Sequence, residues 1–261
     1  MISAKVNYEL TGPSDAPVLV LAGSLGSTLQ MWDPQVEALA GRFRVLRYDH
    51  RGHGRSPVPS GSYTMAELGG DVLALLDRLE IERAAFCGIS LGGMVGIWLG
   101  AHAPQRWTSL TLCSTTAHFE DYGPWNERAA SVRWATTASV APTVVEGWFT
   151  PDWAAQHPEA VQQATQMIAD TSDEGYASCC AAIATWDGRR LLPRIDAPTL
   201  VIAGVKDPGT PVSQHAKTLY TSIPDSKLIV LDAAHLVTVE QAKEVNDLIA
   251  QHALPEDATG E

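Results

Sequence analysis

Cysteine is scarce in this chain, and its few cysteines are not arranged for cross-linking or metal binding. Among 261 residues, Cys87 and Cys113 stand singly in apolar segments, and Cys179 and Cys180 form a vicinal pair. A disulfide framework needs more regularly spaced cysteines, and a zinc knuckle needs the Cys-x-x-Cys spacing. We therefore expect no metal site, and we expect Cys87 and Cys113 to be small hydrophobic side chains of the core.

Long apolar runs and basic residues are also few. No stretch of about 18 consecutive apolar residues occurs, so no transmembrane helix is predicted. The first ten residues show no pattern of a secretory signal, and a cytoplasmic location is expected. Lys and Arg number 18 against 30 Asp and Glu, which gives a net charge of -12. A surface this negative repels phosphate backbones and anionic lipids, so we expect neither nucleic acid nor a membrane as partner.

The residues that are present indicate one α/β domain. The apolar fraction of 45% and the charged fraction of 18% are typical of a well-packed globular protein of this length. Short apolar runs alternate with segments of helical periodicity, one of which follows a predicted N-cap at Thr64. Repeated strand–loop–helix units predict a doubly wound, mostly parallel sheet. The predicted strands cover residues 18–22, 44–48, 84–87, 109–113, 200–203 and 228–231.

The alternation breaks in the middle of the chain. Residues 117–190 show helical patterns without clear strands, and they hold five of the eight tryptophans. We expect this helical insertion to lie over the site as a lid. The predicted core then has two parts, 1–116 and 191–253, and the polar tail 254–261 is expected to be disordered.

The pattern Gly88-x-Ser90-x-Gly92 lies between a predicted strand and a predicted helix. A strand-to-helix turn this sharp strains the backbone of its central residue and leaves no room for side chains two positions away, which favours glycine there. The serine hydroxyl is then held out at the carboxyl edge of the sheet. In this context the pattern predicts that Ser90 is a nucleophile, whereas the same residues elsewhere would indicate an ordinary turn.

A serine nucleophile needs a base, and the base needs an acid that orients it. His235 and Asp207 each follow a predicted strand, and both would reach the same sheet edge as Ser90. Their order, Ser then Asp then His, is the one expected for this architecture. Asp232 is the rival acid, but it lies only three residues before His235, too close to support the imidazole from a neighbouring strand.

Two backbone amides are also needed to stabilise the oxyanion. The first is expected from Leu91, directly after the nucleophile. The second is expected from the Gly/Ser loop after residues 18–22, where Leu25 is favoured and Ser24 is the alternative. An ordinary small-residue turn explains that loop about equally well.

Further segments carry a family likeness. They are Ser-Leu-Gly at 24–26, Met-Trp-Asp-Pro-Gln at 31–35, the Asp-x-Arg-Gly-x-Gly-x-Ser turn at 49–56, Gly-Ile-Ser-Leu-Gly-Gly-Met at 88–94, Trp-Phe-Thr at 148–150 and Ala-His-Leu at 234–236. With the late Asp and His, the chain resembles the α/β-hydrolase fold superfamily and, more narrowly, the 3-oxoadipate enol-lactonases of the β-ketoadipate pathway of aromatic catabolism. Gly23 departs from that likeness, since those enzymes usually have Asn there.

The resemblance implies hydrolysis of a small lactone by a Ser-His-Asp triad, with no metal or organic cofactor. The expected partner is a small-molecule substrate, and oligomeric state is left open. Because that lactone bears a carboxylate, its pocket needs apolar walls and a cation. The insertion supplies Arg128 and Arg133 as possible anchors, Arg133 being favoured, and Trp134 and Trp148 as possible walls. Alternatively, both arginines are surface residues that pair with nearby acids.

Three other functions share the same machinery. A general carboxylesterase and a cofactor-free perhydrolase use the same triad, and a hydrolase-fold ligand receptor keeps a slow triad under a mobile lid. A haloalkane dehalogenase is disfavoured, because its nucleophile would be Asp at position 90.

Overall fold

The computed structural model describes residues 3–254, and a seven-stranded sheet forms its centre. The strand order is β1-β3-β2-β4-β5-β6-β7, and all neighbouring pairs are parallel except β1 with β3. The doubly wound, mostly parallel sheet predicted from the sequence is therefore confirmed. The strands are β1 (Tyr8–Thr11), β2 (Val18–Ala22), β3 (Arg44–Tyr48), β4 (Ala84–Ile89), β5 (Trp107–Cys113), β6 (Thr199–Gly204) and β7 (Ser226–Leu231).

Burial explains which strands the sequence revealed. β4 and β6 are buried along their whole length, as expected for central parallel strands covered on both faces. Strand β1 was not predicted, because it has only four residues, which alternate between half-buried and exposed. It adds to the sheet as an antiparallel edge strand. Of the predicted tail 254–261, only Leu254 lies within the described residues.

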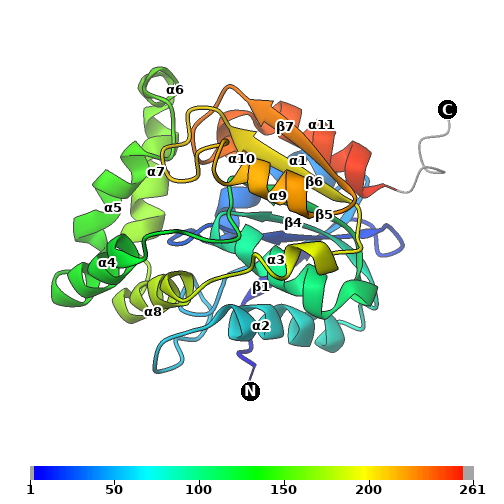
Figure 1. The fold of residues 1–261 in the computed structure, drawn as a ribbon, viewed down its shortest axis with the longest axis horizontal. Coiled ribbons are helices and arrows are strands. Elements are labelled where there is room, and N and C mark those ends of the chain that lie inside the picture. Colours follow the sequence, from blue (N-terminus) through cyan, green and yellow to red (C-terminus); the bar gives the residue numbers. More distant parts are fainter. Residues whose placement is uncertain (1–2, 255–261) are drawn as a thin grey trace.

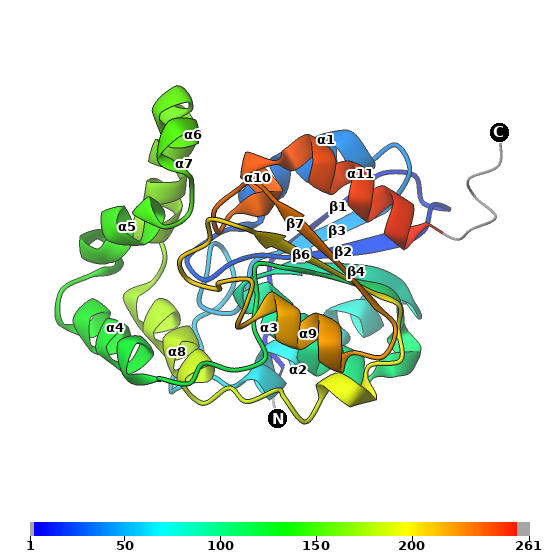
Figure 2. The same cartoon turned by 45° about the horizontal axis from the view of Figure 1, so that its top comes forward.

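Helices cover both faces of the sheet. Figure 2 shows α1 (Asp33–Leu39), α10 (Val237–Glu240) and α11 (Ala242–Ala253) above the sheet, with α2 (Met65–Arg78), α3 (Leu91–His102) and α9 (Ala216–Ser222) below it. The predicted N-cap of α2 is present: Thr64 accepts a hydrogen bond from the Glu67 amide, and the Glu67 carboxylate accepts one from the Thr64 amide. Such a capping box pairs two amides that the helix start would leave unbonded.

The remaining α-helices lie beside the sheet and belong to the chain segment that connects β5 to β6. They are α4 (Gly123–Trp134), α5 (Thr137–Glu146), α6 (Pro151–Gln156), α7 (Pro158–Ala169) and α8 (Asp173–Ala184). Figure 1 shows these five helices at one end of the sheet, next to the loops that follow its parallel strands. This is the segment in which the sequence predicts a helical insertion. Within residues 3–254, none of the helices has the length and hydrophobicity needed to span a bilayer.

Candidate active site

Ser90 occupies a sharp turn between β4 and α3. Its backbone has φ 55° and ψ −114°, a left-handed conformation that costs an ordinary side chain free energy. The neighbouring glycines are needed for space: a Cβ at Gly88 would lie 2.3 Å from the Gly92 carbonyl oxygen, and one at Gly92 would lie 2.1 Å from the Ala22 carbonyl oxygen. The turn is held by the Ser90 amide, which donates to the Cys113 carbonyl at 3.0 Å.

Asp207 and His235 lie in the loops after β6 and β7, and their side chains are hydrogen-bonded. The Nδ1 atom of His235 lies 2.8 Å from Oδ2 of Asp207. The other carboxylate oxygen of Asp207 accepts hydrogen bonds from the amides of Gly209 and Thr210, at 2.8 and 3.0 Å. Burial alone would raise the pKa of Asp207, but the charge of His235 and the hydrogen bonds from His235 and Thr210 together lower it. The buried carboxyl is therefore held as the anion.

One pocket of about 280 Å³ brings Ser90 and His235 together. Both side chains line it, while Asp207 lies behind His235 and is only 4% exposed. The rival acid, Asp232, is instead paired with Lys206 at the surface, 2.6 Å away. This geometry favours Asp207 over Asp232 as the partner of the imidazole.

The loop after β2 also borders the pocket, through Ser24 and Leu25. The Ser24 amide points at the sulfur of Met31, 3.4 Å away. Within residues 3–254 the structure records no acceptor for the Leu25 amide, and the Leu91 amide belongs to the first residue of α3, where no intrahelical acceptor exists. Leu25 and Leu91 thus keep free N–H donors beside Ser90, which favours Leu25 over Ser24.

Two of the four predicted substrate-binding residues line the pocket: Arg128 from α4, and Trp148, which follows α5. The guanidinium carbon of Arg128 lies 4.9 Å from the centre of the Trp125 ring, within the range of a cation–π contact. Among residues 3–254, no carboxylate lies within ion-pair distance of Arg128. A guanidinium without an ion-pair partner in a pocket is suited to bind an anion.

The predictions for Arg133 and Trp134 are wrong. Arg133 does not line the pocket, and its guanidinium pairs with Glu174 at 3.0 Å on the surface. Trp134 ends α4 with 92% of its side chain exposed, so it forms no wall. The alternative interpretation, a surface arginine paired with an acid, holds for Arg133 and not for Arg128.

The pocket is also lined by three aromatic residues that were not predicted from the sequence, Phe119, Trp125 and Tyr176. Trp125 could have been found by helical spacing, since it lies three positions before Arg128 on α4. Tyr176, from α8, carries no motif; its buried hydroxyl lies near the guanidinium of Arg128 in the pocket. Burial raises the pKa of Tyr176, so the phenol stays neutral.

Known proteins resemble this chain over most of its length. A family model described as the alpha/beta hydrolase fold matches residues 16–242. The 3-oxoadipate enol-lactonase 2 of Acinetobacter baylyi is 42% identical over 244 residues, which cover 94% of this chain and 91% of that protein. The crystal structure of the enol-lactonase from Burkholderia xenovorans LB400 matches with a TM-score of 0.93 and 39% identity, covering 95% of this chain and 96% of that one. A hydrolase from Pseudomonas aeruginosa PA01 matches with a TM-score of 0.92 and 43% identity, covering 95% and 94%.

Proposed function

Because the chain belongs to the alpha/beta hydrolase fold family, we propose that it hydrolyses 3-oxoadipate enol-lactone to 3-oxoadipate, with Ser90 as nucleophile. One observation carries the choice of substrate: Ser90 and the unpaired guanidinium of Arg128 line the same pocket. The enol-lactone combines a reactive ester carbonyl with a carboxylate, so it can engage both groups at once. The substrate named for the relatives from Acinetobacter and Burkholderia supports the same choice.

In the proposed first step, His235 accepts the proton of the Ser90 hydroxyl while the hydroxyl oxygen attacks the lactone carbonyl. Asp207 fixes the imidazole with its Nδ1–H toward the carboxylate and stabilises the charged form. The amides of Leu91 and Leu25 donate to the oxyanion, a contribution of roughly 3 kcal/mol per donor in comparable sites. The bond between the acyl carbon and the ring oxygen then breaks, and His235 returns the proton to the leaving enol oxygen.

The leaving enol stays attached, because the broken ester was part of a ring. It tautomerises to the ketone while the acyl group is bound to Ser90. In the second half, His235 takes a proton from water, and the resulting hydroxide attacks the acyl carbon. Collapse returns the proton to Ser90 and releases 3-oxoadipate. Arg128 holds the free carboxylate of the lactone throughout, by a charge-assisted contact.

The test is to follow loss of the ultraviolet absorbance of the enol-lactone with the purified wild type and with Ser90→Ala. We expect the wild type to turn it over, and the variant to lose activity by at least about a thousandfold, because the acyl-enzyme cannot form. Circular dichroism and thermal denaturation should show an intact fold in the variant.

Four outcomes would contradict the proposal. Near wild-type turnover by Ser90→Ala would remove Ser90 from the reaction. Faster turnover of p-nitrophenyl acetate than of the enol-lactone would favour a general carboxylesterase, and strong stimulation by peroxide would favour a perhydrolase. Very slow single-turnover hydrolysis coupled to binding of a protein would favour a ligand receptor.

A further inference from the structure

The loop that carries the Leu25 amide is held by two buried histidines that the catalytic steps do not use. The Gly26 amide donates to Nε2 of His53 at 2.9 Å. On the other side of the Ser24–Leu25 peptide, Nε2 of His50 lies 3.0 Å from the Gly23 carbonyl oxygen. The two contacts thus lie on either side of the Ser24–Leu25 peptide. The N–H of this peptide is the Leu25 amide, the free donor beside Ser90.

The hydrogen bonds of His53 define its protonation. A backbone N–H can only donate, so Nε2 must accept from Gly26, and the ring proton must be on Nδ1. Nδ1 lies 3.2 Å from the Arg51 carbonyl oxygen, which can accept it. Burial lowers the pKa of His53 to about 4, so the imidazole is neutral at neutral pH. An imidazolium would place an N–H against the Gly26 N–H and break the contact.

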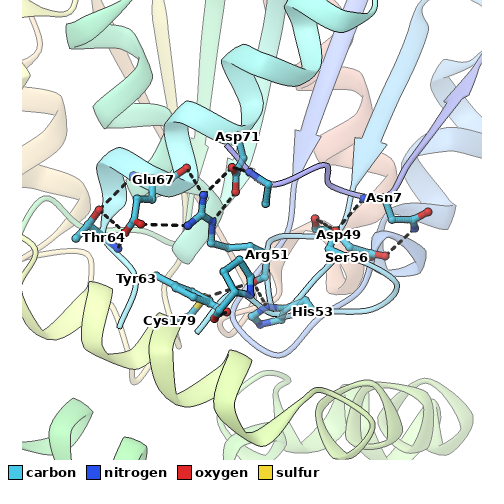
Figure 3. A network of polar contacts seen from close by, with 12 residues as sticks. Asn7, Asp49, Arg51, His53, Ser56, Tyr63, Thr64, Glu67, Asp71 and Cys179 are labelled. Carbon is cyan, nitrogen blue, oxygen red and sulfur yellow. Dashed lines mark hydrogen bonds and ion pairs between the residues drawn. The ribbon is translucent and has the colours of Figure 1, made fainter. Parts of the chain in front are cut away.

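The carbonyl that anchors His53 is itself rigidly placed. Figure 3 shows the Arg51 guanidinium against Asp71 of α2, with hydrogen bonds of 2.6 and 2.7 Å to the two carboxylate oxygens. Both side chains are buried, so this pair is shielded from solvent. Glu67 adds a contact at 3.3 Å. Helix α2 therefore fixes the turn that carries His53.

We propose that His53 is a positioning residue for the oxyanion hole, because its Nε2 fixes the Leu25–Gly26 backbone and so directs the Leu25 N–H toward the reacting carbonyl oxygen. The proposal rests on the acyl-enzyme function proposed above. It predicts a defect in transition-state stabilisation, not in substrate binding, because His53 does not line the pocket and acts on it through the Gly26 amide.

The experiment compares three substitutions of His53. His53→Leu removes the acceptor. His53→Gln keeps an acceptor oxygen at about the reach of Nε2, and His53→Asn carries the same amide one methylene closer to the backbone. His252→Leu is the matched control, since His252 also bonds backbone carbonyls, those of Leu110 and Pro198, but lies far along the chain on α11.

Two rates are measured beside thermal stability: hydrolysis of p-nitrophenyl acetate, and labelling of Ser90 by a fluorophosphonate, whose phosphoryl oxygen uses the same amides. We expect His53→Leu and His53→Asn to lower kcat and the labelling rate by about 10- to 100-fold, with KM within about twofold. His53→Gln should stay within about fivefold of the wild type. His252→Leu should keep both rates even where its stability falls.

Folded His53→Leu or His53→Asn protein with wild-type rates would overturn the proposal. So would a His53→Gln variant as slow as His53→Asn, since that result indicates a purely structural role. If His53→Leu does not fold, the Gln and Asn pair decides the question alone. Neither probe is the enol-lactone, so failure of the wild type on that lactone with normal labelling would refute the substrate and leave this inference standing. A wild type that neither labels nor cleaves esters would refute both.

Discussion

Arg128 and Arg133 lie on the same helix, five residues apart, and their surroundings differ. Arg128 lines the pocket over Trp125, whereas Arg133 is neutralised by Glu174 on the surface. In a protein of net charge -12, a carboxylate-bearing substrate needs such a local cation to offset the surrounding negative charge. The two arginines therefore form a natural pair of test and control.

Arg128→Met should raise KM for the enol-lactone about 10- to 100-fold, because one charged hydrogen-bond partner is lost. Turnover of p-nitrophenyl acetate, which has no carboxylate, should change by less than about threefold. Arg133→Met should leave both substrates nearly unchanged. Steady-state kinetics on both substrates checks this. Equal losses on the two substrates in Arg128→Met would mean that the guanidinium shapes the pocket and does not bind the anion.

The motif residues could be predicted from the sequence as a set, whereas only two of the four predicted substrate-binding residues line the pocket. Ser90, Asp207 and His235 follow strand ends, and a parallel sheet brings strand ends to one edge whatever the details of packing. Ala129 and Val132 define the buried face of α4. Helical spacing alone does not separate the two arginines, because Arg128 lies four residues before Val132 and Arg133 lies four residues after Ala129. They differ through tertiary contacts: Arg128 lines the pocket, and Arg133 meets Glu174 of α8.

At the level of elements, α2 shows how neighbouring positions differ in what they tolerate. Gly69 and Gly70 are adjacent in its interior. A Cβ at Gly69 would lie 2.2 Å from the ring of Trp98 on α3, whereas a Cβ at Gly70 would meet nothing within 4 Å. Gly69 thus permits the close approach of α2 to α3, and Gly70 has no packing role.

Gly70→Ala should raise the free energy of unfolding by about 0.5–1 kcal/mol, because alanine loses less backbone entropy in a helix. Gly69→Ala should lower it by about 1–3 kcal/mol, because Trp98 must move. Urea unfolding of the two variants and the wild type provides the measurement. Both variants should keep wild-type activity per folded molecule. A stabilising Gly69→Ala would show that α2 and α3 are packed less tightly than the structure has them.

Burial also determines which strands could be predicted from the sequence. Buried parallel strands are continuous apolar runs, so residues 18–22 and 44–48 were predicted with the observed bounds of β2 and β3. Strand β1 has no such run and pairs only at an edge, through contacts with β3 that are distant in sequence. Its existence depends on tertiary pairing, which local patterns do not encode.

At the scale of the whole molecule, the buried histidines link the architecture of the site to stability. Burial lowers the pKa of His50 from 6.5 to about 3 and the pKa of His53 from 6.5 to about 4. Between pH 6.5 and 4 the unfolded chain protonates both rings and the folded chain does not. The unfolded state then binds more protons, so the free energy of unfolding falls as the pH is lowered through this window.

Between pH 8 and pH 5, each histidine should remove about 2 kcal/mol from the free energy of unfolding, since a shift of one pKa unit corresponds to about 1.4 kcal/mol. His53→Gln should lose about 2 kcal/mol less than the wild type over the same interval, because glutamine does not titrate. Urea unfolding at the two pH values measures this. His215 and His252, whose pKa values burial also lowers, act in the same direction but are present in both proteins. Identical pH dependence in the variant and the wild type would mean that His53 is protonated or solvated in the folded state, and its neutral acceptor role at Gly26 would be lost with it.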